Sequence, residues 1–410
     1  MRSSWLTLAV AFGAGIAVGL LGPLALKHLS PGPVPSARTP GANGPWGRIE
    51  ALRFPFADSE ELFPDRAIRL QPPRWFFERF SPAQVDNLFG AGDLGPEDKA
   101  ELLDRSHWQL GTNGCLVSPS PELVRRLSPA ARGRIYSVLA HSTVNYAQQF
   151  PFRFPLGDFD SRFAGSGLSE QRLDLLEGLT YTNAGALCFA DLELLPALLA
   201  TNEFHQAVEC LYRLPAYRLR LRVYPGSDIN ALVDYWGKGR EKKIRPLLES
   251  LTRVPATNGV SMAIGYLLPP FARLRLNTFP SAWADMQTDK EDCFWTAMNF
   301  FNEQPDMRYL DPGYVRTALQ AEYSVVKGHP TYGDLVVLFD NSGSAIHSCV
   351  YLAEDFVYTK NGRNKLTPWV LMKISDMLLL FPSDHPYRML YLRKNVTAPR
   401  REGERPREPQ

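Results

Sequence analysis

An uncharged run of 22 residues, Trp5 to Leu26, constrains how this chain can fold more than any other feature. As a helix rising 1.5 Å per residue, the run would extend about 33 Å, which is enough to cross a bilayer. Arg2 before it and Lys27 after it also fit a signal peptide. Because no Ala-x-Ala-like cleavage site follows and the run is longer than a usual signal core, residues 1–29 are predicted to be an uncleaved anchor. A cleaved signal peptide is the alternative.

Two further segments are unsuited to a packed core. Residues 30–45 are rich in Pro, Gly, Ser and Ala without apolar periodicity, and are predicted to be an extended tether. Residues 397–410 carry closely spaced charges of both signs with three prolines, and are predicted to be a disordered tail. The folded mass is therefore expected between residues 46 and 396.

Charge and cysteine content exclude several classes of protein. The chain has 45 Lys and Arg against 43 Asp and Glu, so whole-chain electrostatics do not favour a nucleic-acid partner. Five scattered cysteines without a Cys-x-x-Cys pair indicate neither a disulfide framework nor a structural zinc site. No cofactor and no metal is predicted. One of the five cysteines could instead take part in a chemical reaction.

Residues 46–280 are predicted to form a mainly helical domain of unknown role. Apolar residues recur at three- and four-residue spacing in 169–179, 192–199 and 244–251. One segment differs, because Tyr217 to Tyr224 alternates strictly between arginine and apolar residues and so predicts a strand.

From residue 281 the pattern changes to one helix followed by several short strands. Thr288 and Glu291 fit a capping box at the start of that helix. Its inward stripe would be Phe294, Ala297, Met298 and Phe301, with Cys293 off the stripe in the first turn. Unpaired N–H groups and the helix dipole favour a thiolate there, so Cys293 is the candidate nucleophile.

The strands supply a histidine and its neighbours. Two runs of strand formers, 333–339 and 345–352, are joined by a turn, and His347 lies in the second. A hairpin centred on Glu354 would place His347 opposite Asn361. Thr359 shares the face of Asn361 and is an alternative partner for the imidazole, whereas Lys360 is expected to point outward. Cys349, two residues from His347, leaves a weak His-x-Cys metal alternative.

This constellation resembles the NlpC/P60 group of papain-like cysteine peptidases and amidases over residues 281–396. That group has an Asp-Cys pair opening a helix, a Gly-Asp-Leu-Val strand, a His-x-x-x-Tyr-Leu strand and then a polar residue. The matching residues are Asp292-Cys293, Gly333-Asp334-Leu335-Val336, His347 through Tyr351-Leu352, and Asn361. The resemblance implies an α+β fold whose C-terminal papain-like domain packs a helix on an antiparallel sheet.

The resemblance also implies a function. His347 would take the proton of Cys293, Asn361 would orient the imidazole, and the Cys293 N–H would form part of an oxyanion hole. The expected protein is a membrane-tethered thiol hydrolase of amide bonds, with cell-wall peptides as substrate and its catalytic domain on the extracytoplasmic side. A cleaved leader would make it secreted or periplasmic instead. Acyl transfer or hydrolysis on lipid-like esters, and a non-catalytic binding or scaffold protein, remain the alternatives.

Overall fold

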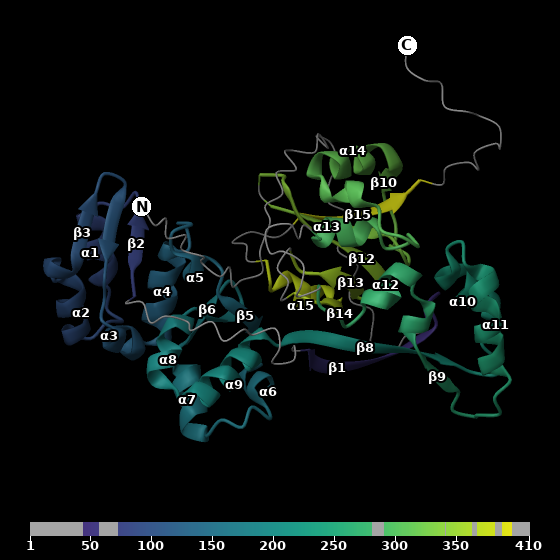
Figure 1. The fold of residues 1–410 in the computed structure, drawn as a ribbon, viewed down its shortest axis with the longest axis horizontal. Helices are drawn as coiled ribbons and strands as arrows, with labels where there is room; N and C mark the ends of the chain where they lie inside the picture. Colours follow the sequence, from purple (N-terminus) through teal and green to yellow (C-terminus); the bar gives the residue numbers. More distant parts are fainter. Residues whose placement is uncertain are drawn as a thin grey trace, which may run out of the picture.

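A computed structural model of the protein describes residues 44–56, 73–280, 291–340, 342–362, 367–381 and 388–395. These residues form a mixed α+β fold with three small antiparallel sheets and a C-terminal six-stranded antiparallel sheet (Figure 1). The predicted α+β class is confirmed. The predicted anchor, almost all of the tether and the tail lie outside the described residues. Among the helices that are described, none is long and apolar enough to cross a membrane.

Residues 75–212 form the first part of the described chain, on the left of Figure 1. They build two three-stranded sheets, β2-β4-β3 and β5-β7-β6, packed by short helices around one apolar core. The strands are β2 (Trp75–Glu78), β3 (Trp108–Gly111), β4 (Gly114–Val117), β5 (Phe152–Pro155), β6 (Thr180–Asn183) and β7 (Ala186–Phe189). The helices are α1 (Pro82–Phe89), α2 (Pro96–Leu103), α3 (Pro121–Arg126), α4 (Pro129–Leu139), α5 (Tyr146–Gln149), α6 (Phe159–Phe163), α7 (Glu170–Gly178), α8 (Leu195–Leu198) and α9 (Thr201–Tyr212).

A buried ion pair joins the helical and strand segments of this part. The Arg132 Nε lies 2.9 Å from the Asp191 Oδ2, and both side chains are almost completely buried. Arg132 also donates to the carbonyl oxygens of Val124 and Gly178, and Tyr136 donates to Asp191. Burying two charges is costly unless they are paired and hydrogen-bonded, and here both conditions are met.

The middle of the chain is less helical than predicted. It contains the two sheets above and a third, β1-β8-β9, formed by β1 (Arg48–Phe56), β8 (Leu214–Val223) and β9 (Val260–Ala263). These strands are four to ten residues long, so several are too short to show a clear period in the sequence. The helices α10 (Ile229–Gly237), α11 (Glu241–Thr252) and α12 (Pro270–Arg275) accompany the third sheet.

The strand predicted at Tyr217–Tyr224 is confirmed as part of β8. Leu219, Leu221 and Val223 are buried on one face, while Arg218 and Arg220 are exposed on the other. β8 pairs with β1 so that Arg222 lies opposite Arg48 and near Glu50, with which it forms an ion pair. The alternation of the sequence was therefore a reliable signal, because only one face of β8 contacts the core.

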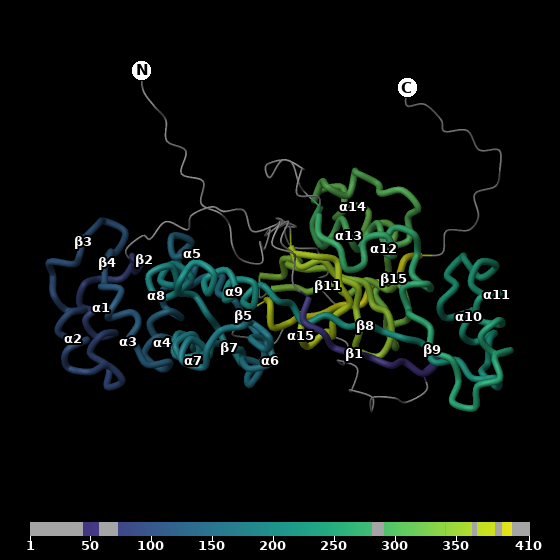
Figure 2. The backbone as a smooth tube through the Cα atoms, turned by 60° about the horizontal axis from the view of Figure 1, so that its bottom comes forward, coloured from purple at the N-terminus to yellow at the C-terminus, as the bar shows by residue number. Residues whose placement is uncertain are grey.

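The hydrophobic core does not divide at residue 280, where the sequence predicted a domain boundary. The third sheet and α10 share one core with the C-terminal sheet. The Tyr235 hydroxyl donates to the Leu352 carbonyl oxygen (2.7 Å), and the Tyr217 ring packs edge-on against Phe356. β1 and β8 run beside the C-terminal sheet in both views (Figures 1 and 2).

The C-terminal sheet has the strand order β10-β15-β11-β12-β13-β14. Its strands are β10 (Tyr323–Val325), β11 (Leu335–Phe339), β12 (Ala345–Ala353), β13 (Phe356–Lys360), β14 (Trp369–Lys373) and β15 (Arg388–Lys394). Three helices accompany it: α13 (Cys293–Met298), α14 (Pro312–Glu322) and α15 (Ile374–Leu378). β11 to β14 are buried along almost their whole length, which explains their continuous apolar runs.

The central strands carry two separate cores, one on each face. Val337, Val350 and Tyr358 belong to the core that contains α13. Val336, Cys349 and Val357 belong to the other core, with Met377 of α15 and Phe381. α13 and α15 lie on different sides of the sheet in Figure 1. A helix packed on an antiparallel sheet, as predicted for this region, is thus present.

Replacing Asp191 with alanine tests the buried ion pair. Arg132 would keep its charge in the core without a carboxylate, so we expect the free energy of unfolding to fall by about 3–5 kcal/mol, measured by urea denaturation. Arg126→Ala, which removes a half-exposed pair with Asp98 in the same part of the chain, should cost less than about 1 kcal/mol. Equal losses in the two variants would contradict this view of the core.

Candidate active site

The helix that carries the candidate nucleophile starts later than predicted. Asp292 is its N-cap, accepting a hydrogen bond from the Trp295 N–H (2.8 Å), and Cys293 is its first residue. The predicted capping box is therefore wrong: Glu291 precedes the helix, and Thr288 lies outside the described residues. Asp292 performs that capping role instead.

The predicted apolar stripe of this helix is also not the pattern observed. All six residues of α13 are buried, whereas Phe301, beyond its end, is partly exposed. The helix is enclosed on every side because α10, α14 and the sheet share its core. Cys293 consequently retains only 5% of its possible exposure.

The register of β12 and β13 follows the predicted hairpin. Tyr351 pairs with Val357 and Val350 pairs with Tyr358, the register expected of a hairpin centred on Glu354. At the turn itself Ala353 pairs with Phe356, and an irregularity between Tyr351 and Ala353 restores the expected register. Continued two and three residues further, this register places Ser348 opposite Lys360 and His347 opposite Asn361. Ser348 and Lys360 lie on the face of α13, and His347 and Asn361 lie on the face of α15.

The sulfur of Cys293 reaches the backbone of β12 beside His347. The Ser348 N–H, which belongs to the peptide bond that follows His347, is near enough to lower the pKa of this thiol. Burial, with a smaller contribution from the Asp292 carboxylate, raises the pKa of the Cys293 thiol to about 12. The Ser348 N–H, Lys360 and the Phe294 N–H oppose this rise because each favours the negative sulfur.

His347 is held by a chain of hydrogen bonds on the other face. Its Nε2 lies 3.1 Å from the Thr359 Oγ1, and the Thr359 hydroxyl donates to the Asn361 Oδ1 (3.0 Å). The Asn361 Nδ2 in turn donates to the Met372 sulfur (3.1 Å). Thr359 is thus the residue that contacts the imidazole, and Asn361 acts through it.

This chain of bonds determines the tautomer of His347. A hydroxyl has one proton, and the Thr359 proton is used on Asn361. The Thr359 oxygen must therefore accept the bond from His347, so the imidazole carries its proton on Nε2. The Nδ1 atom is left with a lone pair that can accept a proton.

That lone pair has no hydrogen-bond partner among the described residues, although Nδ1 is completely buried. The ring packs against Phe381, with the ring centres 4.5 Å apart. Burial lowers the pKa of His347 to about 3, so the imidazole is neutral at physiological pH. Within the described part of the chain, no hydrogen bond joins Nδ1 to the Cys293 sulfur.

The structure places His347, Thr359 and Asn361 together on the α15 face of the sheet, whereas Cys293 lies in the core on the α13 face. The thiol and the imidazole are therefore on opposite faces of β12, which is not the arrangement that the sequence predicted. Transfer of the thiol proton to Nδ1 would require the two atoms to come within roughly 3–3.5 Å. Catalytic hydrogen bonds are often longer than this before substrate binds.

Lys360 does not point outward, as the sequence predicted, but is completely buried. Its Nζ donates to the Gly362 carbonyl oxygen (2.7 Å) and the Thr367 hydroxyl (3.3 Å), and lies 5.7 Å from the centre of the Trp369 ring. The prediction failed because it treated this strand as exposed on one face, whereas the sheet is covered on both.

Cys349 does not support the alternative metal site. Its thiol donates to the Met377 sulfur (3.5 Å) inside the core beneath the sheet. Throughout the described residues, no group of three or more His, Cys, Asp or Glu side chains is arranged to hold a metal ion.

The Gly-Asp pair at the start of β11 has a structural role. Asp334 is buried and accepts two hydrogen bonds from Arg393 of β15, at 2.8 and 2.7 Å, and a third from the Thr331 N–H. Gly333 has a φ of +91°, and a Cβ there would lie 2.5 Å from the Phe301 ring. The motif therefore ties the start of β11 to the neighbouring strand β15 rather than contributing to the chemistry of the thiol.

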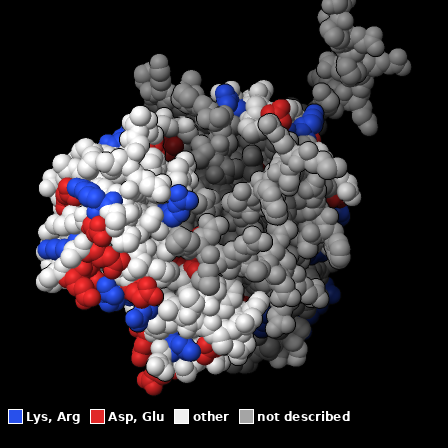
Figure 3. Space-filling view, turned by 60° about the vertical axis from the view of Figure 1, so that its left-hand side comes forward, with Lys and Arg blue, Asp and Glu red and all other residues white. Residues whose placement is uncertain are grey.

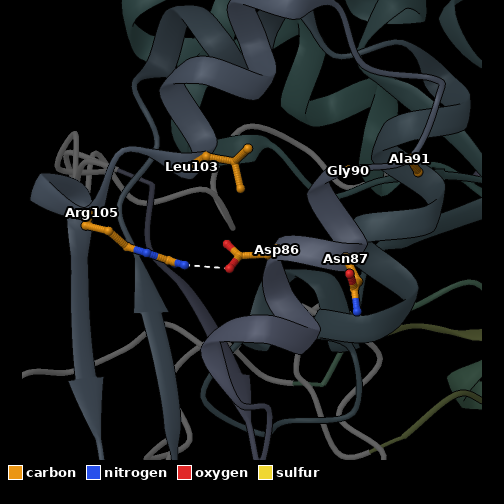
Figure 4. Close-up of a pocket in the computed structure, with 6 residues that line it drawn as sticks. All are labelled: Asp86, Asn87, Gly90, Ala91, Leu103 and Arg105. Carbon is orange, nitrogen blue, oxygen red and sulfur yellow. Dashed lines mark hydrogen bonds and ion pairs between the residues drawn. The ribbon is translucent and has the colours of Figure 1, made fainter.

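Two hollows in the described surface have linings that do not include Cys293. One, of about 600 Å³, is in the first part of the chain and is lined by Asp86, Asn87, Gly90, Ala91, Leu103 and Arg105. Arg105 and Asp86 point toward one another across it and form an ion pair at 2.5 Å (Figure 4). Acidic and basic side chains are intermixed on the face shown in Figure 3. The lining of this hollow likewise contains one acidic and one basic side chain, Asp86 and Arg105.

Comparisons with known proteins identify no relative: no family model matches the chain, and no curated protein or solved structure is significantly similar to it. Evidence for the function therefore comes from the geometry of the site and from the motifs of the sequence.

The burial of neutral His347 predicts a pH-dependent stability. Between pH 6.5 and pH 3 the unfolded chain binds a proton on this imidazole that the folded protein does not, so stability falls as the pH falls. The slope contributed by His347 should approach 1.4 kcal/mol per pH unit, as an order of magnitude. Urea unfolding of the wild type and of His347→Gln between pH 7 and pH 4 measures this slope. Parallel pH dependences would show that His347 is not buried as a neutral ring.

Proposed function

We propose that the C-terminal part of this protein is a papain-like thiol hydrolase of the NlpC/P60 type. The observation that carries the proposal is the packing of α13, which begins at Cys293, against β12, the strand that holds His347, whose buried Nδ1 has no hydrogen-bond partner in the described structure. A buried acceptor without a donor is costly, and the proposal requires the Cys293 thiol to reach the face of His347 and supply that donor.

The mechanism that follows uses each of these groups. His347 takes the thiol proton on Nδ1, and the Cys293 sulfur attacks the carbonyl carbon of an amide. The imidazolium returns the proton to the leaving amine as the C–N bond breaks, leaving a thioester. Water, deprotonated by His347, then releases the acid and the free thiol. Thr359 holds the ring in the Nε2–H tautomer throughout, and Asn361 fixes the Thr359 hydroxyl.

The substrate and the location rest on the sequence. Resemblance to the NlpC/P60 group favours the amide bonds of cell-wall peptides. Residues 5–26 would tether the protein to a membrane, with the hydrolase on the extracytoplasmic side; cleavage of this segment would release a secreted or periplasmic enzyme. Among the described residues we find no feature that favours lipid esters over amides.

A non-catalytic binding protein is the second candidate, and one observation favours it. Both Cys293 and His347 are almost fully buried, on opposite faces of β12, and they share no hydrogen bond in the described structure. A fold that had lost its reaction could retain both residues as parts of its two cores. Activity of single-residue variants distinguishes this candidate from the hydrolase.

Cys293→Ala should abolish hydrolysis, with a loss on the order of 10³-fold or more, because no other group would form the acyl intermediate. The measurement is release of peptide fragments from purified peptidoglycan by the full-length protein, alongside release of fatty acid from phospholipid vesicles. Release of fatty acid without peptide fragments would move the proposal to an ester substrate.

Cys115→Ala is the matched control, since it removes a buried cysteine from the core of the first part of the chain. It should leave the rate unchanged. Thr359→Val, which keeps the volume of the side chain but removes the acceptor for Nε2–H, should lower kcat by roughly 10-fold to 10²-fold. If wild type and Cys293→Ala are equally active or equally inactive on both substrates, the binding protein is the better description.

A further inference from the structure

The buried Lys360 has no place in the mechanism above, although it lies on the same face of the sheet as the thiol. The register of β12 and β13, continued two residues beyond the Val350–Tyr358 pair, places it opposite Ser348, whose N–H lowers the pKa of the Cys293 thiol. Its own strand pairs it with Trp369 of β14. Lys360 therefore lies on β13, on the same face of the sheet as the sulfur and beside the part of β12 that the sulfur approaches.

Two contacts hold the lysine in relation to the helix of the nucleophile. The Lys360 Nζ lies 5.7 Å from the centre of the Trp369 ring, within the range of a cation–π interaction. The Trp369 Nε1 donates to the Thr296 hydroxyl on α13 (3.0 Å). Thr296 is one turn after Cys293, so the indole connects the ammonium to the turn that carries the thiol.

An ammonium in this position is unusual. Lysine is almost never fully buried, because removal of its charge from water is costly. The same burial strengthens its effect on nearby charges, since the effective dielectric constant is lower than at the surface. A negative sulfur is the charge that the proposed reaction creates beside it.

We propose that Lys360 is a positioning residue whose ammonium stabilises the Cys293 thiolate. The ammonium lies on the same face of the sheet as the sulfur and offsets its negative charge there. The use of this charge in catalysis rests on the proposed hydrolase function, whereas its effect on thiol acidity does not.

Other charged and titratable groups also face the sulfur. Asp292 precedes it on α13, and its carboxylate opposes the thiolate. Cys349 of β12 interacts electrostatically with Cys293, whereas His347 is neutral and lies on the opposite face of β12 from the sulfur. Arg275 of α12 lies beyond Trp295 and Trp369, 5.2 and 5.6 Å from their ring centres. Lys360 is the cation among them that favours ionisation of the Cys293 thiol.

The test is the pH dependence of Cys293 alkylation by iodoacetamide in the full-length protein. Rates are read from the Cys293 peptide by mass spectrometry between pH 7 and pH 10, so that the other four cysteines do not interfere. Lys360→Met should raise the thiol pKa and slow alkylation roughly tenfold at each pH, since tenfold corresponds to one pKa unit. Lys360→Arg keeps the charge and should stay within about threefold of wild type.

Controls separate electrostatics from damage to the fold. Lys373→Met removes a lysine from the neighbouring strand, where it packs on Tyr217 and Phe356 away from the thiol, and should leave the profile unchanged. If Lys360→Met does not fold, Lys360→Gln retains a donor for the Gly362 carbonyl oxygen and is compared instead. A folded Lys360→Met or Lys360→Gln whose profile matches wild type would overturn the proposal.

The two proposals fail separately. Alkylation requires no substrate, so slower alkylation in Lys360→Met supports the counter-charge even if no hydrolysis is detected in the wild type. Conversely, hydrolysis could be lost in Cys293→Ala while the alkylation profile of Lys360→Met stays unchanged. That result would support the hydrolase function and show that Lys360 does not act on the Cys293 thiol.

Discussion

The pairing of β12 with β13 is the constraint on which the candidate site depends. Continued beyond the Val350–Tyr358 pair, its register assigns His347 and Asn361 to one face of the sheet and Ser348 and Lys360 to the other. A shift by one residue would exchange these faces and place the lysine beneath the sheet. The hairpin turn supports the register, since Glu354 adopts the left-handed conformation (φ +54°) between the two strands.

Coverage of the sheet on both faces explains the electrostatics of the site. α13 closes one face and α15 with Phe381 closes the other, so the thiol, imidazole and ammonium all lie in low-dielectric surroundings. Burial makes the thiol and the imidazole neutral, as the directions of their pKa shifts show. A negative charge would then form on the sulfur only when the thiol proton leaves. The Lys360 ammonium, which packs on the Trp369 ring, would be the cation near that charge.

Interactions of the middle segments tie the site to the rest of the chain. Tyr235 of α10 donates to the carbonyl oxygen of Leu352 on β12, and Tyr217 of β8 donates to Asp376 on α15. Both contacts anchor elements that carry or cover the candidate residues. The segment after residue 213 is thus part of the same body as the proposed hydrolase, while the core of residues 75–211 is built separately.

Local patterns in the sequence predicted the α+β class, the strand at β8 and the hairpin register, whereas the catalytic role of Cys293, His347 and Asn361 stays a prediction. Each of these depends on residues close together in the chain, where periodicity and turn chemistry are informative. Tertiary structure alone decided that Lys360 is buried, that Thr359 stands between His347 and Asn361, and that the Cys293 sulfur meets the Ser348 N–H. The reason is that burial and side-chain contacts arise from helices packing on both faces of the sheet, which no window of sequence contains.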